Sequence, residues 1–188
     1  MKNLLLYACS IVLFTACTTP DYDLIIRNGQ ILDGSGNPSY RGDLAITADT
    51  IAAIGDLSDA TATEIIDAGG LAVAPGFINM LSWANVSLLH DGRSMGDIYQ
   101  GVTLEVMGEG TSMGPLTSKM KQEMADDQGD ITYNISWTTL GEYLDHLAAR
   151  GVSPNVASFV GNGTLRRHVI GYENRPATNE ELNQMKEL

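Results

Sequence analysis

The residues of this chain whose types and spacing favour chemistry are few and lie far apart in the sequence. His90 and Asp91 are neighbours, and an imidazole beside a carboxylate can transfer protons as an acid/base pair. Arg166 and Arg167 follow a Gly-Asn-Gly turn, and the guanidinium group of Arg166 can bind a substrate carboxylate through two hydrogen bonds. Both motifs have a structural alternative: His90-Asp91 as a surface turn, and Arg166 as a member of an ion pair.

Other catalytic and ligand-binding motifs are incomplete. The glycines between Gly108 and Gly114 lack the lysine of a phosphate-binding loop, and Ser82 lacks the flanking glycines of a nucleophile elbow. The acidic segment 126–130 lacks the glycine and the glutamate of a calcium-binding loop. His146 falls on the polar side of its expected helix, where we expect it to face solvent. Calcium, phosphate and serine-nucleophile chemistry are therefore not indicated.

The charge balance excludes one large class of functions. The 188 residues include 11 Lys or Arg and 23 Asp or Glu, which gives a formal net charge of −12. Nucleic-acid binding needs clustered basic side chains that displace phosphate counterions, and the sequence has no such cluster. With 44% hydrophobic residues the chain can bury a core, so disorder is excluded as well. We therefore expect a folded, acidic protein that does not bind nucleic acid.

The first residues are typical of an export signal. Lys2 precedes an apolar run over residues 4–14, which is too short to span a bilayer, and small residues come directly before Cys17. This pattern resembles a bacterial lipobox, in which the signal is removed and the cysteine carries a lipid. It predicts a signal peptide over residues 1–16, a linker over 17–21, and an exported protein lipid-anchored to the bacterial membrane, facing the periplasm or the cell surface. An ordinary signal peptide with a chance cysteine is the alternative, and it also predicts export.

Residues 22–70 carry β-strand signals with no helix between them. Short apolar runs at residues 24–26 and 30–32 flank Asn28-Gly29, which is a strong hairpin signal. Further apolar or alternating runs follow at residues 43–46, 50–55 and 64–67. Short strands in this arrangement predict a small β-sandwich or a meander, and the β-sandwich is the expectation we adopt.

Residues 71–188 alternate between strand and helix signals. Strands are expected within residues 71–81, 101–108 and 155–160. Residues 139–151 predict an amphipathic helix with a glycine at its end, and Thr178 and Glu181 form a capping-box pattern that opens a further helix. This order predicts βα units and a parallel sheet. Because a parallel barrel has eight strands, we expect these residues to form the first three units of an incomplete barrel.

Several of these segments together resemble the amidohydrolase superfamily. Residues 22–36, which include Asp-Leu-Ile-Ile-Arg-Asn-Gly and Leu-Asp-Gly-Ser-Gly, and residues 69–78, which end in Pro-Gly-Phe-Ile, are similar to the opening of its members. Residues 100–106 and 161–167 are most similar to the D-aminoacylase branch, the N-acyl-D-amino-acid deacylases. The resemblance extends over residues 22–188, and we interpret the chain as the N-terminal portion of such a protein.

The resemblance implies a fold, a cofactor and a reaction. Members of the family have a β-sandwich beside a TIM-like barrel, which is an α/β fold class. Zinc at the C-terminal face of the barrel activates a water molecule, because the ion lowers the pKa of that water to about 7. The implied activity is hydrolysis of the amide bond of an N-acyl-D-amino acid or a similar small molecule. A catalytically silent surface lipoprotein that binds ligands at the barrel mouth is the alternative.

The chain departs from the family at the metal-binding positions. The family has His-x-His after the first barrel strand, and Leu81 and Trp83 occupy those positions here. It has a cysteine ligand after the second strand, where this chain has Gly110. Glu109, one position away, can reach a metal through an oxygen atom or can brace the loop instead, and Trp83 can line an acyl-binding wall or simply pack.

These departures leave three interpretations of the metal site. One metal of the usual pair is lost, the site is inactive, or the ligands have moved to other positions. The remaining family ligands would fall after Leu188, so we expect no catalytic residue within this portion and no activity from this portion alone.

Overall fold

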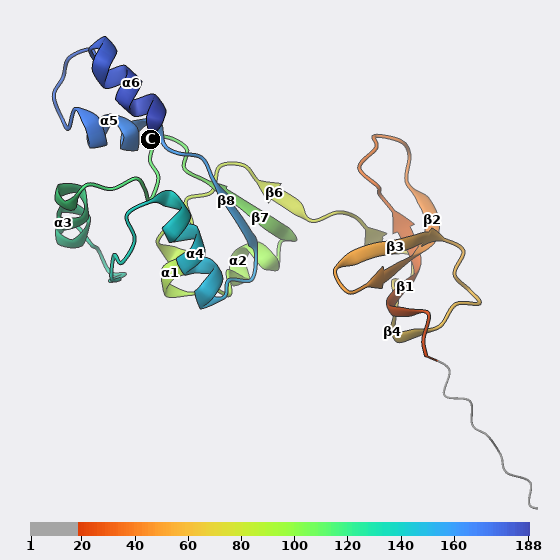
Figure 1. The fold of residues 1–188 in the computed structure, drawn as a ribbon. Coiled ribbons are helices and arrows are strands. Elements are labelled where there is room, and N and C mark those ends of the chain that lie inside the picture. The colour runs from red at the N-terminus through yellow and green to blue at the C-terminus, as the bar shows by residue number, and fades with distance from the viewer. Residues whose placement is uncertain (1–18) are drawn as a thin grey trace, which may run out of the picture. The chain divides into compact units, whose positions relative to one another are not determined.

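A computed structural model describes residues 19–188, and these residues divide into two compact units after Pro75 (Figure 1). Cys17 and the predicted signal peptide lie outside the described residues. Within residues 19–188, no helix is both long enough and apolar enough to cross a membrane. Strands and helices are both present, so the expected mixed α/β composition is confirmed.

The first unit is one sheet built around its longest strand. Its strands are β1 (Tyr22–Ile31), β2 (Tyr40–Thr47), β3 (Thr50–Gly55), β4 (Ala62–Asp67) and β5 (Ala72–Val73). β1 pairs antiparallel with β2 and parallel with β4 and β5, while β3 pairs antiparallel with β2. Ile25, Ile31 and Ala45 are buried on this sheet. All of its strands belong to a single sheet, so the second layer of the expected sandwich is not confirmed within residues 19–75.

The Asn28-Gly29 pair lies inside β1, so the predicted hairpin at this position is wrong. The pairing of β1 with β2 shifts register between Ile26 and Gly29, which marks a β-bulge, and Asn28 has a positive φ of 57°. The Asn28 N–H donates to Asp43 (2.8 Å), and its side-chain amide donates to Asp67 (2.9 Å). A left-handed Asn-Gly step serves a bulge as well as a tight turn, because both need a residue that tolerates positive φ.

The second unit contains a parallel sheet with helices beside it (Figure 1). Its strands are β6 (Phe77–Asn79), β7 (Val102–Met107) and β8 (Asn155–Ser158), in that order across the sheet. Its helices are α1 (Ser87–His90), α2 (Met95–Ile98), α3 (Ser118–Asp126), α4 (Leu140–Arg150), α5 (Asn162–Val169) and α6 (Asn179–Glu187). The three strands fall within the segments where the sequence predicts strands.

A buried cluster holds the helices against β7. Its members are Leu88, Leu89, Met107, Met113, Leu116, Met120, Trp137, Tyr143 and Leu147. The Trp137 indole N–H donates to the carbonyl of Met113 (2.8 Å), and the Tyr143 hydroxyl donates to the carbonyl of Asn85 (2.8 Å). Both polar tips are therefore satisfied inside the cluster, which fixes α1 and α4 relative to the sheet.

The capping box predicted at Thr178 is confirmed, and α4 starts with a second one that the sequence reasoning did not name. Thr139 and Glu142 exchange side-chain and backbone hydrogen bonds at the start of α4, and Gly151 ends this helix with a φ of 82°. Thr178 and Glu181 do the same at the start of α6. Each box satisfies backbone N–H groups that a helix start leaves without partners, which explains why these helices begin where the sequence predicts.

Candidate functional site

The candidate site lies at the carboxyl ends of β6, β7 and β8, because the ends of parallel strands meet at one edge of their sheet. β6 is followed by residues 80–83, β7 by residues 108–111, and β8 by residues 159–161. The first two turns contain the positions that the family motifs mark in the sequence, Leu81 and Trp83 after β6 and Glu109 and Gly110 after β7.

The turn after β6 is anchored through Ser82. Its N–H donates to the carbonyl of Val106 on β7 (3.0 Å), and its hydroxyl accepts from the N–H of Ala84 (3.2 Å). Ser82 is only 4% exposed, whereas its neighbours Leu81 and Trp83 are 55% and 66% exposed. The turn therefore presents an aliphatic and an aromatic side chain to solvent from a fixed backbone, and neither can bind a metal.

Glu105 on β7 is a buried carboxylate that sequence reasoning missed. It is 0% exposed, and its Oε2 accepts a hydrogen bond from the Asn79 side-chain amide on the neighbouring strand (3.1 Å). Its Oε1 has no hydrogen-bond partner within residues 19–188. A buried polar atom without a partner is costly, so this oxygen needs either a partner from outside the described residues or a function. The available signal was a single glutamate in an otherwise apolar strand.

Asn79 links Glu105 to the turn after β6. Its amide nitrogen donates to Glu105, while its side-chain oxygen accepts from the N–H of Leu81 (3.2 Å). The carboxylate therefore fixes the amide, and the amide in turn fixes the backbone that carries Leu81 and Trp83.

The turn after β7 packs directly on the start of α5. Gly108 has a φ of 90°, and a Cβ there would overlap the carbonyl of Phe159, so only glycine fits. The Gly110 carbonyl accepts from the N–H of Gly163 (2.7 Å), and the N–H of Gly161 donates to the Ser112 hydroxyl (2.9 Å). Glycine makes these backbone contacts possible because it has no side chain to separate the two segments.

The described residues do not by themselves form a metal site. Within residues 19–188, no group of three or more His, Cys, Asp or Glu side chains is close enough to hold an ion. Leu81, Trp83 and Gly110 carry no ligand atoms in their side chains. Glu109 is exposed on its turn, and Glu105 is bound to Asn79, so this edge offers two separate carboxylates.

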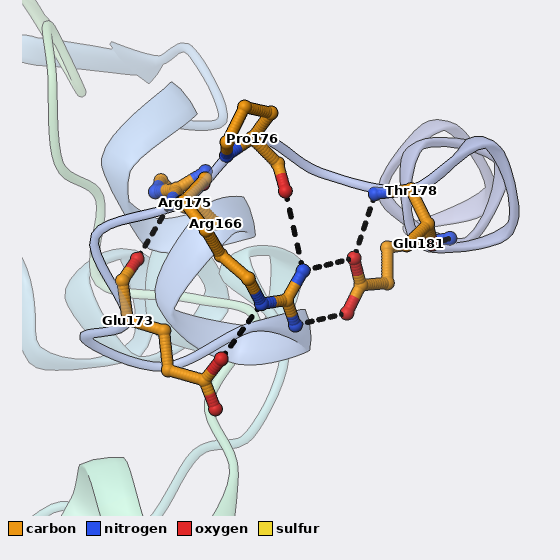
Figure 2. Close-up of polar contacts among 6 residues, drawn as sticks. All are labelled: Arg166, Glu173, Arg175, Pro176, Thr178 and Glu181. Atoms are coloured by element: carbon orange, nitrogen blue, oxygen red, sulfur yellow. Dashed lines mark hydrogen bonds and ion pairs between the residues drawn. The ribbon is translucent and has the colours of Figure 1, made fainter.

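Arg166 holds the loop between α5 and α6 (Figure 2). One nitrogen of its guanidinium group donates to the carbonyls of Glu173 (2.7 Å) and Arg175 (2.6 Å). Arg175 forms ion pairs with Glu173 (2.7 Å) and Glu181 (2.7 Å). The Arg175 guanidinium and the Thr178 N–H lower the pKa of Glu181 to about 2. Arg166 thus has a structural role, and its binding of a substrate carboxylate stays a prediction.

His90 and Asp91 do not pair with each other. The Asp91 carboxylate accepts two hydrogen bonds from the Arg93 guanidinium (2.9 and 2.8 Å) and one from the Arg93 N–H (3.0 Å). These bonds hold the pKa of Asp91 well below its usual range. The motif is therefore a surface turn, and the acid/base interpretation of it is wrong.

Comparisons with known proteins extend these observations. No protein-family model matches the chain. A D-aminoacylase from Alcaligenes xylosoxydans xylosoxydans is 39% identical over 171 residues, which cover 89% of this chain and 34% of that protein. A solved D-aminoacylase is 33% identical with a TM-score of 0.74, and the match covers 89% of this chain and 35% of that one. That enzyme has a binuclear metal centre, in which one metal activates and the second attenuates.

A further solved structure is similar over the same extent. It is an N-acyl-D-glutamate deacylase from Bordetella bronchiseptica, in complex with zinc and a phosphonate inhibitor that mimics the tetrahedral intermediate. It is 28% identical with a TM-score of 0.74, and the match covers 88% of this chain and 35% of that one.

In sequence and in fold the chain is similar to the amidohydrolases. Within that class its relatives are the D-aminoacylases, so the resemblance stated from the sequence motifs is confirmed. The chain spans about a third of the length of the curated relatives it matches.

Proposed function

We propose that the whole protein to which these residues belong hydrolyses the amide bond of N-acyl-D-amino acids. The observation that carries this proposal is the 39% identity to a D-aminoacylase over 89% of the chain. Further relatives are an N-acyl-D-aspartate deacylase and an N-acyl-D-glutamate deacylase, which supports including N-acylated acidic amino acids among the substrates to be tested. A catalytically silent ligand-binding lipoprotein is not favoured by these relatives.

We also propose that this protein depends on a metal whose ligands come mainly from outside residues 19–188. Related enzymes carry metals, zinc in one of them. When bound, such a metal supplies a Lewis acid that activates water. The described residues lack a ligand set, and Leu81 and Trp83 stand where the family has histidines, so we expect fewer metal ions than a binuclear centre holds. Glu109 is the ligand we assign to this region.

The residues of this region then have binding and positioning roles. The exposed indole of Trp83 is available to contact the acyl group, and the bonds of Ser82 hold the turn that carries it. Arg166 keeps its assignment to a substrate carboxylate as a proposal. We further propose that the protein is exported and anchored by lipid at Cys17, facing the periplasm or cell surface.

The test is an activity assay on the full-length protein. We would measure release of free amino acid from N-acetyl-D-leucine and N-acetyl-D-glutamate, with the L-enantiomers as controls and with a metal-stripped sample in parallel. We expect hydrolysis of D-substrates that falls when metal is removed. A folded, metal-loaded protein that hydrolyses none of these substrates would contradict the proposal.

The assignment of Glu109 has its own test. Replacing it, as Glu109→Gln, removes the negative charge that a metal prefers, so the metal content of the purified protein should fall. The control is Glu64→Gln, an exposed glutamate on β4 of the first unit, which should leave the metal content unchanged. Equal metal content in both variants would remove Glu109 from the site without affecting the proposed activity.

A further inference from the structure

A polar pocket of about 330 Å³ lies away from the strand ends, in the second unit. Its polar lining includes His90, Tyr133, Asn134, Ser136, His146 and Arg150. The lining contains no Asp or Glu within residues 19–188, although acidic residues outnumber basic ones by 23 to 11 in the chain. Two of the chain's three histidines and one arginine therefore line this pocket without a carboxylate in its lining; Asp91, the acidic residue next to His90, is bonded to Arg93 instead.

Trp137 fixes two walls of this pocket. The Tyr133 ring stacks on its indole with centroids 6.3 Å apart and an angle of 5°, and the His146 ring tilts against it at 5.3 Å. The side chain of Gln128 also bonds both the N–H (3.0 Å) and the carbonyl (2.8 Å) of Tyr133. These contacts use ring faces and backbone atoms. The Tyr133 hydroxyl and the His146 imidazole therefore have no hydrogen-bond partner among the described residues.

Arg150 supplies the positive charge. It lies one turn after His146 on α4, so the two side chains share a side of the helix. One guanidinium nitrogen donates to the carbonyl of His90 (3.2 Å), which holds the group in place. Within residues 19–188, Arg150 forms no ion pair, in contrast to Arg93, whose guanidinium is bonded to Asp91 through two nitrogens.

A helix-end role explains only part of this arrangement. Arg150 is the last residue of α4, and a cation at that place stabilises the helix terminus. That role accounts neither for the position of His146 one turn earlier nor for the hydrogen-bond donors on the facing loop. It also leaves open why the lining contains no carboxylate.

We propose that this pocket binds a compact oxyanion, a phosphate or carboxylate group, of a small-molecule ligand. Guanidinium groups bind such oxyanions through paired N–H donors, and the imidazole and hydroxyl groups of the lining complete the set of donors. The pocket is separate from the candidate site, because α4 ends at Arg150 before the amino end of β8, whereas the candidate site is at the carboxyl ends. The proposal is therefore independent of the proposed function.

The experiment is isothermal titration calorimetry of the full-length protein with inorganic phosphate and, separately, with acetate, in a Tris chloride buffer. We expect saturable binding of at least one anion, and the two titrations distinguish a phosphate ligand from a carboxylate ligand. Arg150→Gln and His146→Gln should each weaken binding about tenfold, the effect of losing one hydrogen bond to a charged group.

The control variant is Arg93→Gln. This removes a nearby arginine whose charge is already paired with Asp91, so the affinity should stay within about twofold of the wild-type value. The His146 ring packs against Trp137, so His146→Gln can also perturb the core. Arg150 does not contact Trp137, so the affinity of Arg150→Gln is decisive if the two variants bind the anion differently. The absence of saturable binding of either anion, or equal weakening in Arg150→Gln and Arg93→Gln, would overturn the proposal.

Discussion

Replacing the buried Glu105 should change stability and activity in opposite directions, so this residue offers a sharp test. One carboxylate oxygen is bonded to Asn79, and the other is buried without a partner within residues 19–188. The variant Glu105→Met has a similar length and no polar atoms that need partners. We predict that it unfolds at a higher temperature than the wild type and hydrolyses the substrate more slowly.

The magnitude follows from the two oxygen atoms. A buried polar atom left without a partner costs about 1–3 kcal/mol, and the hydrogen bond to Asn79 contributes about 0.5–1.5 kcal/mol. Asn79 is only partly buried, so water can reach its amide once Glu105 is replaced. The net gain is about 1 kcal/mol in the free energy of unfolding. A given gain shifts Tm less in a larger protein, so the increase is at most about 2–4 °C, the value for a domain of 150–250 residues.

The measurement is scanning calorimetry of the full-length protein, with the hydrolysis assay on the same samples. Glu64→Met, which removes an exposed glutamate, is the control and should change the free energy of unfolding by less than about 0.5 kcal/mol, half the effect expected for Glu105→Met. A lower Tm in Glu105→Met, with the control unchanged, would refute the reasoning, because it would mean that the free oxygen has a partner in the whole protein. A more stable variant with full activity would show that the carboxylate serves no function.

Three further predictions concern packing and pH. Gly161→Ala should destabilise the protein by about 1–3 kcal/mol in denaturant unfolding, because the added Cβ would lie 2.5 Å from the Cα of Thr111. The control is Gly129→Ala, whose Cβ would meet no atom within 4 Å and which should leave the stability unchanged. Because the pKa of Glu181 is lowered to about 2 from 4.5, its ion pair with Arg175 stabilises the fold above about pH 4.5, and this contribution is lost as the pH falls towards 2. An acid titration followed by circular dichroism should therefore show a smaller change in Glu181→Gln than in the wild type, and identical curves would contradict this. Trp137→Phe should cost about 1–3 kcal/mol in thermal unfolding, because it leaves space and removes the bond to the Met113 carbonyl; an unchanged Tm would show that the cluster tolerates the loss.

The sequence predicted those elements whose local signals agree with their packing. For α4 the sequence indicates an apolar face and a terminal glycine, and both are present in the structure. β7 is an apolar run between two glycines, and it forms the centre of the parallel sheet. In both segments the local preference and the burial favour the same element, so a pattern in one sequence was sufficient.

The failures occurred where one local signal serves two structures. Asn28-Gly29 predicts a tight turn, yet here it forms a bulge, and only the pairing of β1 with its neighbours distinguishes them. The start of α5 contains Gly161-Asn162-Gly163, which reads as a loop, although Gly161 and Gly163 are needed for contact with the turn after β7.

The candidate site shows the same limit. The family motifs in the sequence were sufficient to place four residues at strand ends: Leu81, Trp83, Glu109 and Gly110. The buried state of Glu105 does not, because it depends on which strand lies beside β7 and on Asn79 being opposite. A lone glutamate in an apolar strand was the only local sign.

The contacts between the turn after β7 and α5 determine which side chains can vary at the carboxyl-end edge of the parallel sheet. They join main-chain atoms of Gly110 and Gly163, and of Gly161 with the Ser112 side chain, so the outline of the edge depends little on which large side chains surround it. Leu81 and Trp83 are exposed on the neighbouring turn after β6, which takes no part in these contacts, so they can be exchanged without rebuilding the frame. Mutational libraries directed at substrate preference should therefore vary those two positions and keep the glycines, since the frame preserves the shape while the substituents set the chemistry.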